Sequence, residues 1–505
     1  MNSDGQHSGG ASKNTSKTNA KAGLIHLSND TMVTARDGRQ HSWGSVKLLL
    51  ATLIVSALGD GFCGVMMSVA LPDISETFHI SLATANWVTV GYAIVAATTV
   101  MISASLLAKR GLKKLFSFSR IVLIISCVIG LFSANFPMLL VSRLVQAVAS
   151  GIMWPTINTV IIRVVPSNVS GRVLSLNSAI IGLGMAVAPL ISGMFLSYVS
   201  LTSMYIVPLA IGILSLLMGF KFMFNVEDRK DEKIDPISVI LAFMGLAFLM
   251  LGISEVTHQP LPACLLIAVG AAVIIWFGYR QMHIKQPVLN IQPLLKYKFV
   301  SGGVLQYILG GMGQQAILLL LPLFLERACG YSDAASGAFL IITTVIYAGG
   351  TLVAGKIVDK KGLWPVMTVG FLMLTAGMLV MYATASHKIA LLMAVIGGFA
   401  AAGYALVNVP VKDVVMELLP DSQTADVSAI FSTGFQVASS IGSALFVGIL
   451  SADVLRLTAE HTVKSAAYVN GFEHSIIIGV IIEAATMALS VWYSRKMLKR
   501  RTKDQ

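Results

Sequence analysis

The stretch Leu139–Pro155, LLVSRLVQAVASGIMWP, lies inside an apolar run that extends from Pro137 to about Ile162. It contains Arg143, which we expect to be the only basic residue in the membrane interior. A lone arginine in hydrocarbon costs roughly 2.5–3.5 kcal/mol on insertion scales, so it should face a protein interior or a wet cavity and have a partner. The alternative is that its side chain extends to the nearer interface, about two helical turns away.

The composition is that of a polytopic membrane protein. Of 505 residues, 55% are apolar and only 12% are charged, against about 25% charged in soluble domains. The net charge of +12 does not point to nucleic acid, because the basic residues gather in short loops between apolar runs. The four cysteines show no metal-binding or disulfide spacing. The sequence therefore predicts no metal, no cofactor and no enzymatic activity.

Fourteen apolar runs are long enough to cross a bilayer as helices. They span roughly 46–71, 82–107, 115–133, 137–162, 173–197, 202–222, 237–256, 261–279, 299–325, 334–357, 364–384, 388–411, 426–451 and 475–494. With the N-terminus inside, the outer loops hold few basic residues: Arg327, Lys388, Arg456 and Lys464. The fourteen runs predict an all-α membrane protein. The charge bias predicts that both termini lie in the cytoplasm.

Two loops resemble each other and divide the chain into halves. Ala108 corresponds to Asp359 and Gly111 to Gly362, each pair 251 residues apart. Such a repeat indicates a transporter with a central site between two bundles. We expect a disordered cytoplasmic tail at 1–45, a six-helix bundle at 46–222, a charged linker with an inserted two-helix hairpin and connector at 223–298, a second six-helix bundle at 299–494 and a basic cytoplasmic tail at 495–505.

Several short motifs carry a resemblance to a known family. They are Ser68–Asp73 (SVALPD), Asn86–Tyr92 (NWVTVGY), Ser142–Ala147 (SRLVQA), Pro287–Leu289 (PVL) and Leu320–Phe324 (LLPLF). The arrangement resembles the major facilitator superfamily, in its fourteen-helix drug–proton antiporter branch, and two of these motifs look most like Gram-positive tetracycline-efflux proteins. The resemblance implies two six-helix bundles plus a two-helix insert, and alternating access between them.

The resemblance also implies residues that control conformation. In the first cytoplasmic loop Lys109 and Gly111 match the family pattern, but Ala108 replaces an aspartate that helps to latch the halves. The second copy keeps Asp359 and Gly362, so the latch is expected there. Ala188, Pro189 and Gly193 lie in the fifth run, where the family has its antiporter motif. The alternatives are a turn that carries topology charges and a helix with a small packing face.

Asp60 is the predicted proton carrier. An acid in low dielectric can take up and release a proton near neutral pH, and the neighbouring glycines should leave room for a partner, water or ligand. Arg143 is assigned to proton coupling with it, by biasing a nearby acid toward the charged form. The alternative is a structural acid paired with a helix end or with Arg143. Glu483, in the last run, is expected to pack or to face water, and Glu326 to lie on a solvated outer rim.

Polar and aromatic residues within the spans are the candidates for a substrate cavity. They are Trp87, Tyr92, Gln146, Trp154, Asn158, Asn177, Gln306, Tyr307, Gln314, Tyr404, Asn408, Phe431 and Gln436. Each by itself is more often a packing residue. As a set they suit an amphipathic organic molecule better than an ion.

These observations predict a proton-coupled exporter of small amphipathic compounds or drugs. It would be a monomer in the lipid bilayer of a bacterial plasma membrane, with protons and a small molecule as its partners and no nucleic acid. Two alternatives stay open. One is a transporter specific for one metabolite or lipid, possibly a symporter, and the other is a membrane sensor that does not transport.

Overall fold

The fold is helical throughout its membrane part. A computed structural model describes residues 32–34, 40–165, 167–226, 234–256, 259–361, 363–419 and 421–501. Within these residues, 14 helices are long and apolar enough to cross a membrane. The prediction of an all-α protein with fourteen spans is thus confirmed. A short antiparallel pair, β1 (Met32–Thr34) and β2 (Gln40–Ser42), precedes the first helix.

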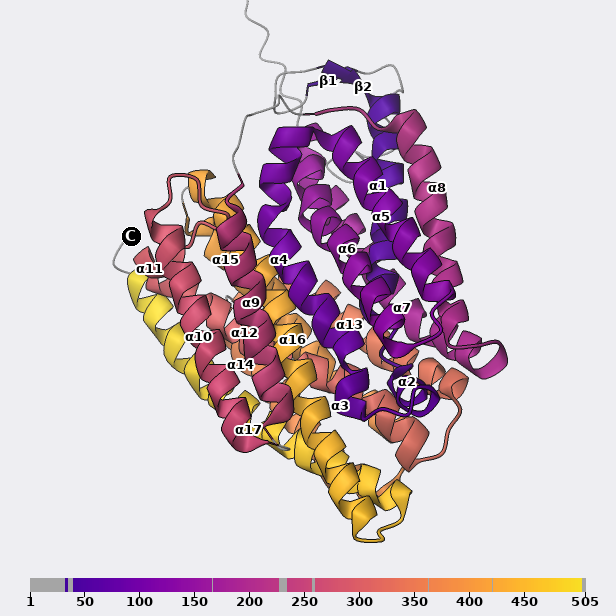
Figure 1. The fold of residues 1–505 in the computed structure, drawn as a ribbon. Coiled ribbons are helices and arrows are strands. Elements are labelled where there is room, and N and C mark those ends of the chain that lie inside the picture. The colour runs from indigo at the N-terminus through magenta and orange to yellow at the C-terminus, as the bar shows by residue number, and fades with distance from the viewer. Residues whose placement is uncertain are drawn as a thin grey trace, which may run out of the picture.

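The first group of helices packs mainly against its own members. It comprises α1 (Trp43–Val65), α2 (Leu71–Thr77), α3 (Leu82–Ala85), α4 (Trp87–Arg110), α5 (Leu112–Leu131), α6 (Phe136–Val164), α7 (Ser167–Tyr198), the 3₁₀ turn η1 (Thr202–Tyr205) and α8 (Ile206–Phe222). Figure 1 shows this half in indigo and magenta. We call it the N-terminal half.

The second group of helices, which we call the C-terminal half, also packs mainly against its own members. It comprises α11 (Gln292–Lys296), α12 (Lys298–Leu323), the single-turn π-helix η2 (Phe324–Ala328), α13 (Asp333–Lys361), α14 (Leu363–Thr384), the 3₁₀ turn η3 (Ala385–His387), α15 (Ala390–Glu417), α16 (Asp421–Ala459) and α17 (Lys464–Arg501). Pro322 lies inside α12, two residues before η2 begins, and a proline removes the backbone donor that a regular α-helical turn needs.

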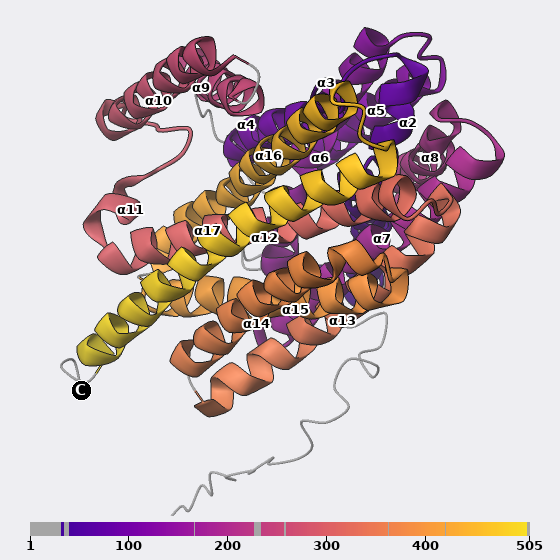
Figure 2. The ribbon, with the colours of Figure 1, turned by 90° about the horizontal axis from the view of Figure 1, so that it is seen from below.

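A hairpin of α9 (Pro236–Glu255) and α10 (Pro260–His283) lies between the halves in sequence and packs beside α4 and α16, as Figure 2 shows. An ion pair joins the two helices at the end of the hairpin away from its turn. Asp235 caps α9 by accepting from the Ser238 backbone, and Arg280 of α10 donates to both carboxylate oxygens of Asp235 at 2.9 and 3.1 Å. The bonds from Arg280 hold the pKa of Asp235 below its usual range.

Some predicted boundaries were wrong. The tail does not extend to residue 45, because Ser42 caps a helix that begins at Trp43. The first span ends at Val65 rather than at 71, and Leu71 begins the separate helix α2. The predicted basic tail at 495–505 is not contradicted: α17 continues beyond the membrane span, which ends at Trp492, as far as Arg501.

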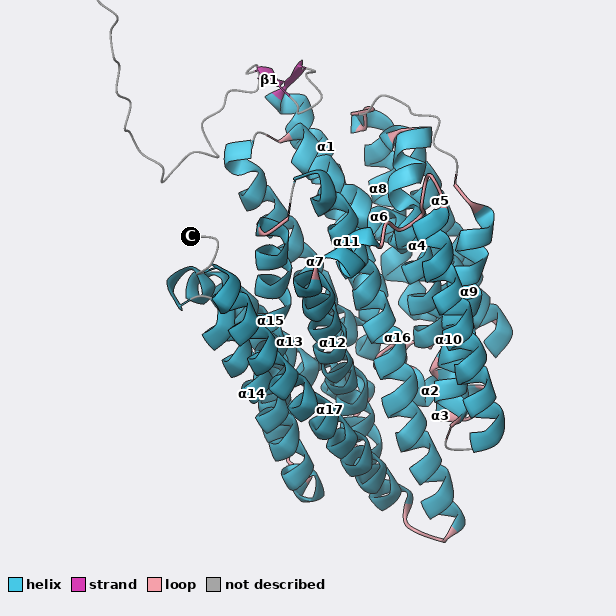
Figure 3. Cartoon of the chain, turned by 90° about the vertical axis from the view of Figure 1, so that its left-hand side faces the viewer, coloured by secondary structure: helices cyan, strands magenta, loops and turns pink. Residues whose placement is uncertain are grey.

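The two halves meet at the end of the molecule that carries α2 and α3, opposite β1 and β2 (Figures 1 and 3). We call this the distal end. Asn86, at the break between α3 and α4, donates to the Ser443 carbonyl at 2.9 Å and accepts from the Ser443 hydroxyl at 2.8 Å. Nearby, the Ala334 amide donates to Ser197 at 3.1 Å. Polar contacts thus join the halves at the distal end.

Candidate functional site

A buried ion pair lies in the N-terminal half. Asp60 of α1 is 3% exposed and Arg120 of α5 is fully buried. Nη2 of Arg120 donates to the two carboxylate oxygens of Asp60 at 3.1 and 3.2 Å. Ser150 of α6 donates to the same carboxylate at 3.3 Å, and the Ser119 hydroxyl accepts from Nη2 of Arg120 at 3.0 Å. Three helices therefore hold one carboxylate.

Arg143 of α6 forms a second centre. Its Nε donates to the Val88 carbonyl at 3.3 Å, and its Nη1 donates to the Cys63 carbonyl at 3.1 Å and to the Gln146 side chain. The guanidinium lies 4.3 Å from the ring centroid of Tyr92, a cation–π distance. Arg143 is 1% exposed. It therefore ties α6 to both α1 and α4.

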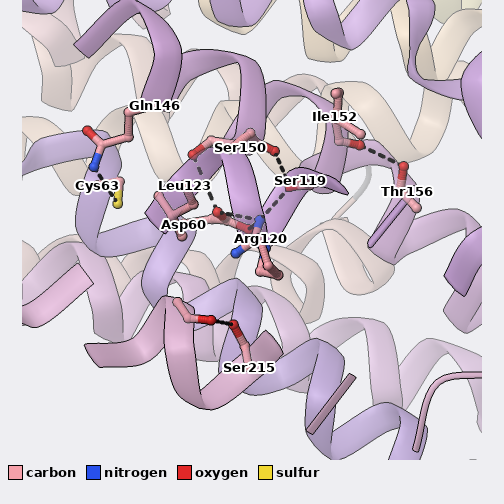
Figure 4. A network of polar contacts seen from close by, with 12 residues as sticks. Asp60, Cys63, Ser119, Arg120, Leu123, Gln146, Ser150, Ile152, Thr156 and Ser215 are labelled. Carbon is pink, nitrogen blue, oxygen red and sulfur yellow. Dashed lines mark hydrogen bonds and ion pairs between the residues drawn. The ribbon is translucent and has the colours of Figure 1, made fainter. Parts of the chain in front are cut away.

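The two centres are successive layers of one interface. Cys63 lies three residues after Asp60 on α1, and Gln146 lies four residues before Ser150 on α6, so each pair shares a helix face. Nε2 of Gln146 is 3.2 Å from the Cys63 sulfur. Figure 4 shows the Asp60 and Cys63 layers side by side. A change at either layer can reach the other through one turn of α1 and α6.

The predictions from the sequence did not place Arg120 in the interior. The predicted run 115–133 contains this residue, but Arg143 was taken as the one basic residue of the interior. Helix α5 begins at Leu112, so Arg120 lies two turns inside it. The partner of Asp60 is consequently Arg120, and Arg143 bonds instead to backbone carbonyls and Gln146. The position of Arg120 inside the predicted run 115–133 was the signal that could have placed it in the interior.

The glycines near Asp60 do not leave room for a ligand in the way the sequence predicted. A Cβ on Gly59 would lie 2.7 Å from Ile211 of α8, and one on Gly61 would lie 2.5 Å from the Ile181 carbonyl of α7. Only Gly64 of the three faces open space. The first two glycines bring α1 close to α8 and α7, which seals the layer around Asp60.

The structure divides the cavity candidates by exposure. Those buried are Tyr92, Gln146, Asn177, Gln306, Tyr307, Tyr404, Phe431 and Gln436. Those partly exposed are Trp87, Trp154, Asn158, Gln314 and Asn408. The partly exposed side chains are in contact with water or lipid in this conformation. Their role in binding stays a prediction.

Two of the partly exposed residues link separate helices. Trp154 of α6 lies 5.9 Å, centroid to centroid, from Phe435 of α16, so the halves also touch through aromatic rings. Asn158 accepts from Asn177 of α7 at 3.2 Å. These side chains place amide and indole groups together on the inner face of the N-terminal half.

In the C-terminal half, aromatic candidates form a packed cluster. The Tyr307 ring lies 5.1 Å from that of Phe431 and 6.3 Å from that of Tyr404, whose hydroxyl donates to the Tyr307 carbonyl at 3.2 Å. Glu483 of α17 is fully buried, so it does not face water. A Cβ on Gly313 of α12 would overlap its carboxylate. The absence of a side chain at Gly313 therefore leaves space for the Glu483 carboxyl group between α12 and α17.

The residues assigned to conformational control fall in two places. Lys109 is exposed, and Gly111 takes a left-handed backbone angle, φ 76°, that ends α4. Ala188 is buried, and Pro189 lies inside α7 against Gly337 of α13. The Asp359 side chain and Gly362 lie outside the described residues. Gly193 packs on the backbone of Asp333 at the start of α13.

An apolar groove of 280 Å³ opens between α4 and α9. It is lined by Val95, Thr98, Thr99, Val239, Ile240, Phe243 and Met244. The two threonine hydroxyls donate to their own helix backbone. The groove therefore offers no free polar group, and none of the cavity candidates lines it.

Comparison with known proteins gives the family. The sequence pattern of the Major Facilitator Superfamily matches residues 49–443. The lincomycin resistance protein LmrB of Bacillus subtilis is 27% identical over 446 residues, which cover 85% of this chain and 93% of that protein. The riboflavin transporter RibZ of Clostridioides difficile is 22% identical over 454 residues, covering 89% and 98%.

The fold has solved counterparts. A bacterial homologue of the human lysosomal transporter Spinster, in an inward-facing and occupied conformation, superimposes with a TM-score of 0.66 at 17% identity, covering 91% of this chain and 99% of that one. At this identity the likeness concerns the fold alone. The family match extends over most of the chain and includes the layers around Asp60 and Arg143. The chain therefore belongs to the major facilitator superfamily and is an integral, multi-pass membrane transporter of small molecules.

Proposed function

We propose that this transporter exports small amphipathic organic compounds in exchange for protons. The observation that carries the proposal is the buried pair of Asp60 and Arg120, 3.1 Å apart in the first half. A carboxylate at this depth is stable while Arg120 compensates its charge. Protonating it leaves the guanidinium buried without a counter-charge, which is costly. Proton uptake at Asp60 is thereby linked to a rearrangement of α1, α5 and α6.

Arg143 acts beside this pair rather than on it. Its bonds to the carbonyls of Cys63 and Val88 hold α1, α4 and α6 in one arrangement. A shift of α1 by part of a turn, driven from Asp60, has to break at least one of these bonds. Arg143 is therefore a positioning residue that makes the response of the three helices concerted.

The direction of transport rests on the predicted orientation and on the closed distal end. With both termini in the cytoplasm, the distal end faces outside. The contacts of Asn86 and Ala334 then keep the outer side shut in this conformation. Protons that enter after the distal end opens would return the carrier to the present state. This order of steps is antiport by alternating access, and the Ala188–Gly193 segment of α7 would be the surface along which the halves slide.

The substrate class follows from the exposed candidates and the relatives. Indole and amide side chains with few charges suit an amphipathic organic molecule. LmrB confers resistance to lincomycin according to its name, which makes lincomycin the first compound to test. RibZ, named for riboflavin, supports the second candidate, a transporter of one metabolite. The direction of substrate flux in everted vesicles separates these candidates.

The decisive experiment measures substrate-dependent proton movement in proteoliposomes. Asp60→Asn keeps the size of the side chain but cannot ionise, so it should abolish uphill export while downhill substrate exchange continues. Asp60→Asn with Cys63→Asp should recover part of the coupling, because the new acid stands in the layer of Arg143 and Gln146. Glu460→Gln, an exposed acid at the α16–α17 turn, is the matched control and should behave as wild type.

Two outcomes would refute parts of this proposal. Full proton coupling by Asp60→Asn would move the proton site elsewhere, and Glu483 would be the next residue to test. A panel of drugs and metabolites, lincomycin and riboflavin included, that evokes no pH change and no change in host susceptibility would favour a membrane sensor.

A further inference from the structure

A cluster of charges spans the two halves at the distal end. Arg327 of η2 reaches α2 of the other half, with Nη1 2.8 Å from Glu76 and Nη2 3.5 Å from Asp73. Lys464, at the start of α17, lies 3.2 Å from Glu76. Asp333 begins α13 beside them and acts electrostatically on Asp73. These residues and Glu326 are called the distal cluster.

Glu326 is the unexpected member. The sequence predicted a solvated rim position, but the residue is 7% exposed. Neither carboxylate oxygen meets the geometry of a hydrogen bond with a described residue, and the nearest hydroxyl, that of Ser336, interacts with it only weakly. The side chain belongs to the widened turn η2, and the groups that face it are Ser336 and Asp333 of α13, Asp73 of α2 and its neighbour Arg327. Tyr468 of α17 also lies within its electrostatic reach.

The charges of the distal cluster do not balance. It holds four carboxyl groups and two cations: Arg327 bonds to Asp73 and Glu76, and Lys464 bonds to Glu76. An ionised carboxylate that is buried without a hydrogen bond costs several kcal/mol. Ionising Glu326 in this closed arrangement therefore has a large energetic cost, because no cation of the cluster is bonded to it. No group of three or more His, Cys, Asp or Glu in the described part of the chain is arranged to hold a metal ion instead.

A second carboxyl group of the distal cluster, Asp73, also favours the protonated form. It is half-buried on α2, outside the membrane-spanning segments, and its Oδ2 lacks a partner among the described residues. Burial and the nearby Asp333 raise its pKa to about 6, against the opposing effect of Arg327. Glu76 behaves oppositely, because Lys464 and Arg327 lower its pKa despite partial burial. Outside the spans, the cluster thus contains one acid that stays ionised, Glu76, and one that favours a proton, Asp73.

We propose that Glu326 and Asp73 form a second proton-binding site, which takes up protons as the distal end closes and releases them as it opens. The physical basis is that opening separates α2 from η2 and exposes both carboxyls to water, where they ionise near their ordinary range. This inference depends on the proposed function only for its role in coupling, since a pH-controlled distal end needs neither a substrate nor a gradient. If the distal end faces outside, external protons favour its closure.

The direction of the pH effect follows from linkage. The closed state binds more protons, so low pH favours it. For Asp73 the advantage is complete below the open-state value near 4 and disappears above about 6. A difference of roughly two pKa units changes the closed-to-open ratio about a hundredfold across this interval.

The test measures the distance between the halves at the distal end as a function of pH. Spin labels are placed on cysteines at Val199, after α7, and at Ser386, in η3, both exposed and outside the distal cluster. The four native cysteines are replaced, and the full-length protein is reconstituted without substrate or gradient. In the unsubstituted background the long-distance population should grow as pH rises from 4.5 to 8.5.

Glu326→Gln mimics the protonated side chain and should keep the distal end closed to higher pH. Asp73→Asn should flatten the response between pH 4 and 6, and the double variant should show almost no pH dependence. Glu460→Gln, an exposed acid at the same end, should reproduce the background curve. Glu326→Met, which is also uncharged, gives the same test if the glutamine variant does not fold.

The proposal is overturned if the background distance distribution does not change with pH, or if Glu326→Gln and Glu326→Met retain the full background curve. Loss of coupling in the Asp60 variants with an unchanged pH response at the distal end would leave this site intact. A pH-independent distal end in a protein that still exchanges protons for substrate would refute this site alone.

Discussion

At the scale of single residues, charge compensation decides what each buried group can do. Arg120 and Asp60 neutralise each other in the closed layer of α1, α5 and α6. Arg143 lies one layer away and is satisfied by carbonyl groups and by Gln146. Two arginines with similar burial therefore have different partners: Arg120 pairs with a carboxylate, and Arg143 bonds to carbonyl groups of two neighbouring helices.

The ion pair makes a stability prediction. Arg120→Met removes the charged partner and leaves Asp60 buried with only serine hydroxyls beside it, which should destabilise the protein by about 3–5 kcal/mol. Adding Asp60→Asn removes the orphaned charge and should restore most of that loss. Thermal unfolding in detergent compares the two variants. A double variant no more stable than Arg120→Met would show that the pair contributes by packing rather than by charge.

Arg143 makes a prediction for transport. Arg143→Lys should impair export without preventing insertion, since one ammonium cannot reproduce bonds from both Nε and Nη1 together with stacking on Tyr92. Tyr92→Phe keeps the ring and should export nearly as wild type. Tyr92→Leu should lose about 1 kcal/mol of cation–π interaction and export several-fold more slowly. Initial rates at equal expression decide this, and near-normal export by Arg143→Ala would contradict the assigned role.

At the scale of elements, α7 and α13 form the closest contact between the halves. The carbonyl of Pro189 packs on Gly337, and Gly193 packs on the backbone of Asp333. Backbone on backbone leaves no flexible side chain to yield. Closure of the distal end therefore depends on the absence of a Cβ at Gly193 and Gly337. Small movements of α7 are transmitted to the start of α13, beside the distal cluster.

A pair of alanine substitutions in α7 tests this dependence. A Cβ on Gly193 would overlap the Asp333 carbonyl, whereas one on Gly182 meets nothing within 4 Å. Gly193→Ala should shift the Val199–Ser386 distance toward the open population. Gly182→Ala, which should only favour the helix, by up to about 1 kcal/mol, is the matched control. Equal distance distributions in the two variants would argue that α13 can move aside freely.

At the scale of the whole molecule, the position of charge predicts the orientation in the membrane. Basic residues are concentrated on the side of the termini, and the distal loops hold few of them. An impermeant thiol reagent added to intact cells should label a cysteine at Ser200, exposed at the distal end, and spare one at Lys285, exposed at the other. Both are made in a background without native cysteines. The reverse pattern would invert the orientation and the direction assigned to transport.

The sequence by itself determined the features that depend on local composition. Each of the fourteen spans is recognisable because a helix must remain apolar for about 20 residues to cross hydrocarbon, and no distant residue alters that requirement. The family resemblance and the depth of Asp60 also follow from short segments. Boundaries were less certain, because a cap such as Ser42 or a break such as Asn86 depends on single side chains.

Only the tertiary structure decided how the polar groups are paired. Arg120 and Asp60 are 60 residues apart, and Arg327 and Asp73 are 254 apart, so no local pattern joins them. Glu326 looked like a rim residue because it ends an apolar run, yet η2 turns it inward against α13. Burial and the identity of the nearest charge are properties of packed helices, and they determine which carboxyl groups carry a proton.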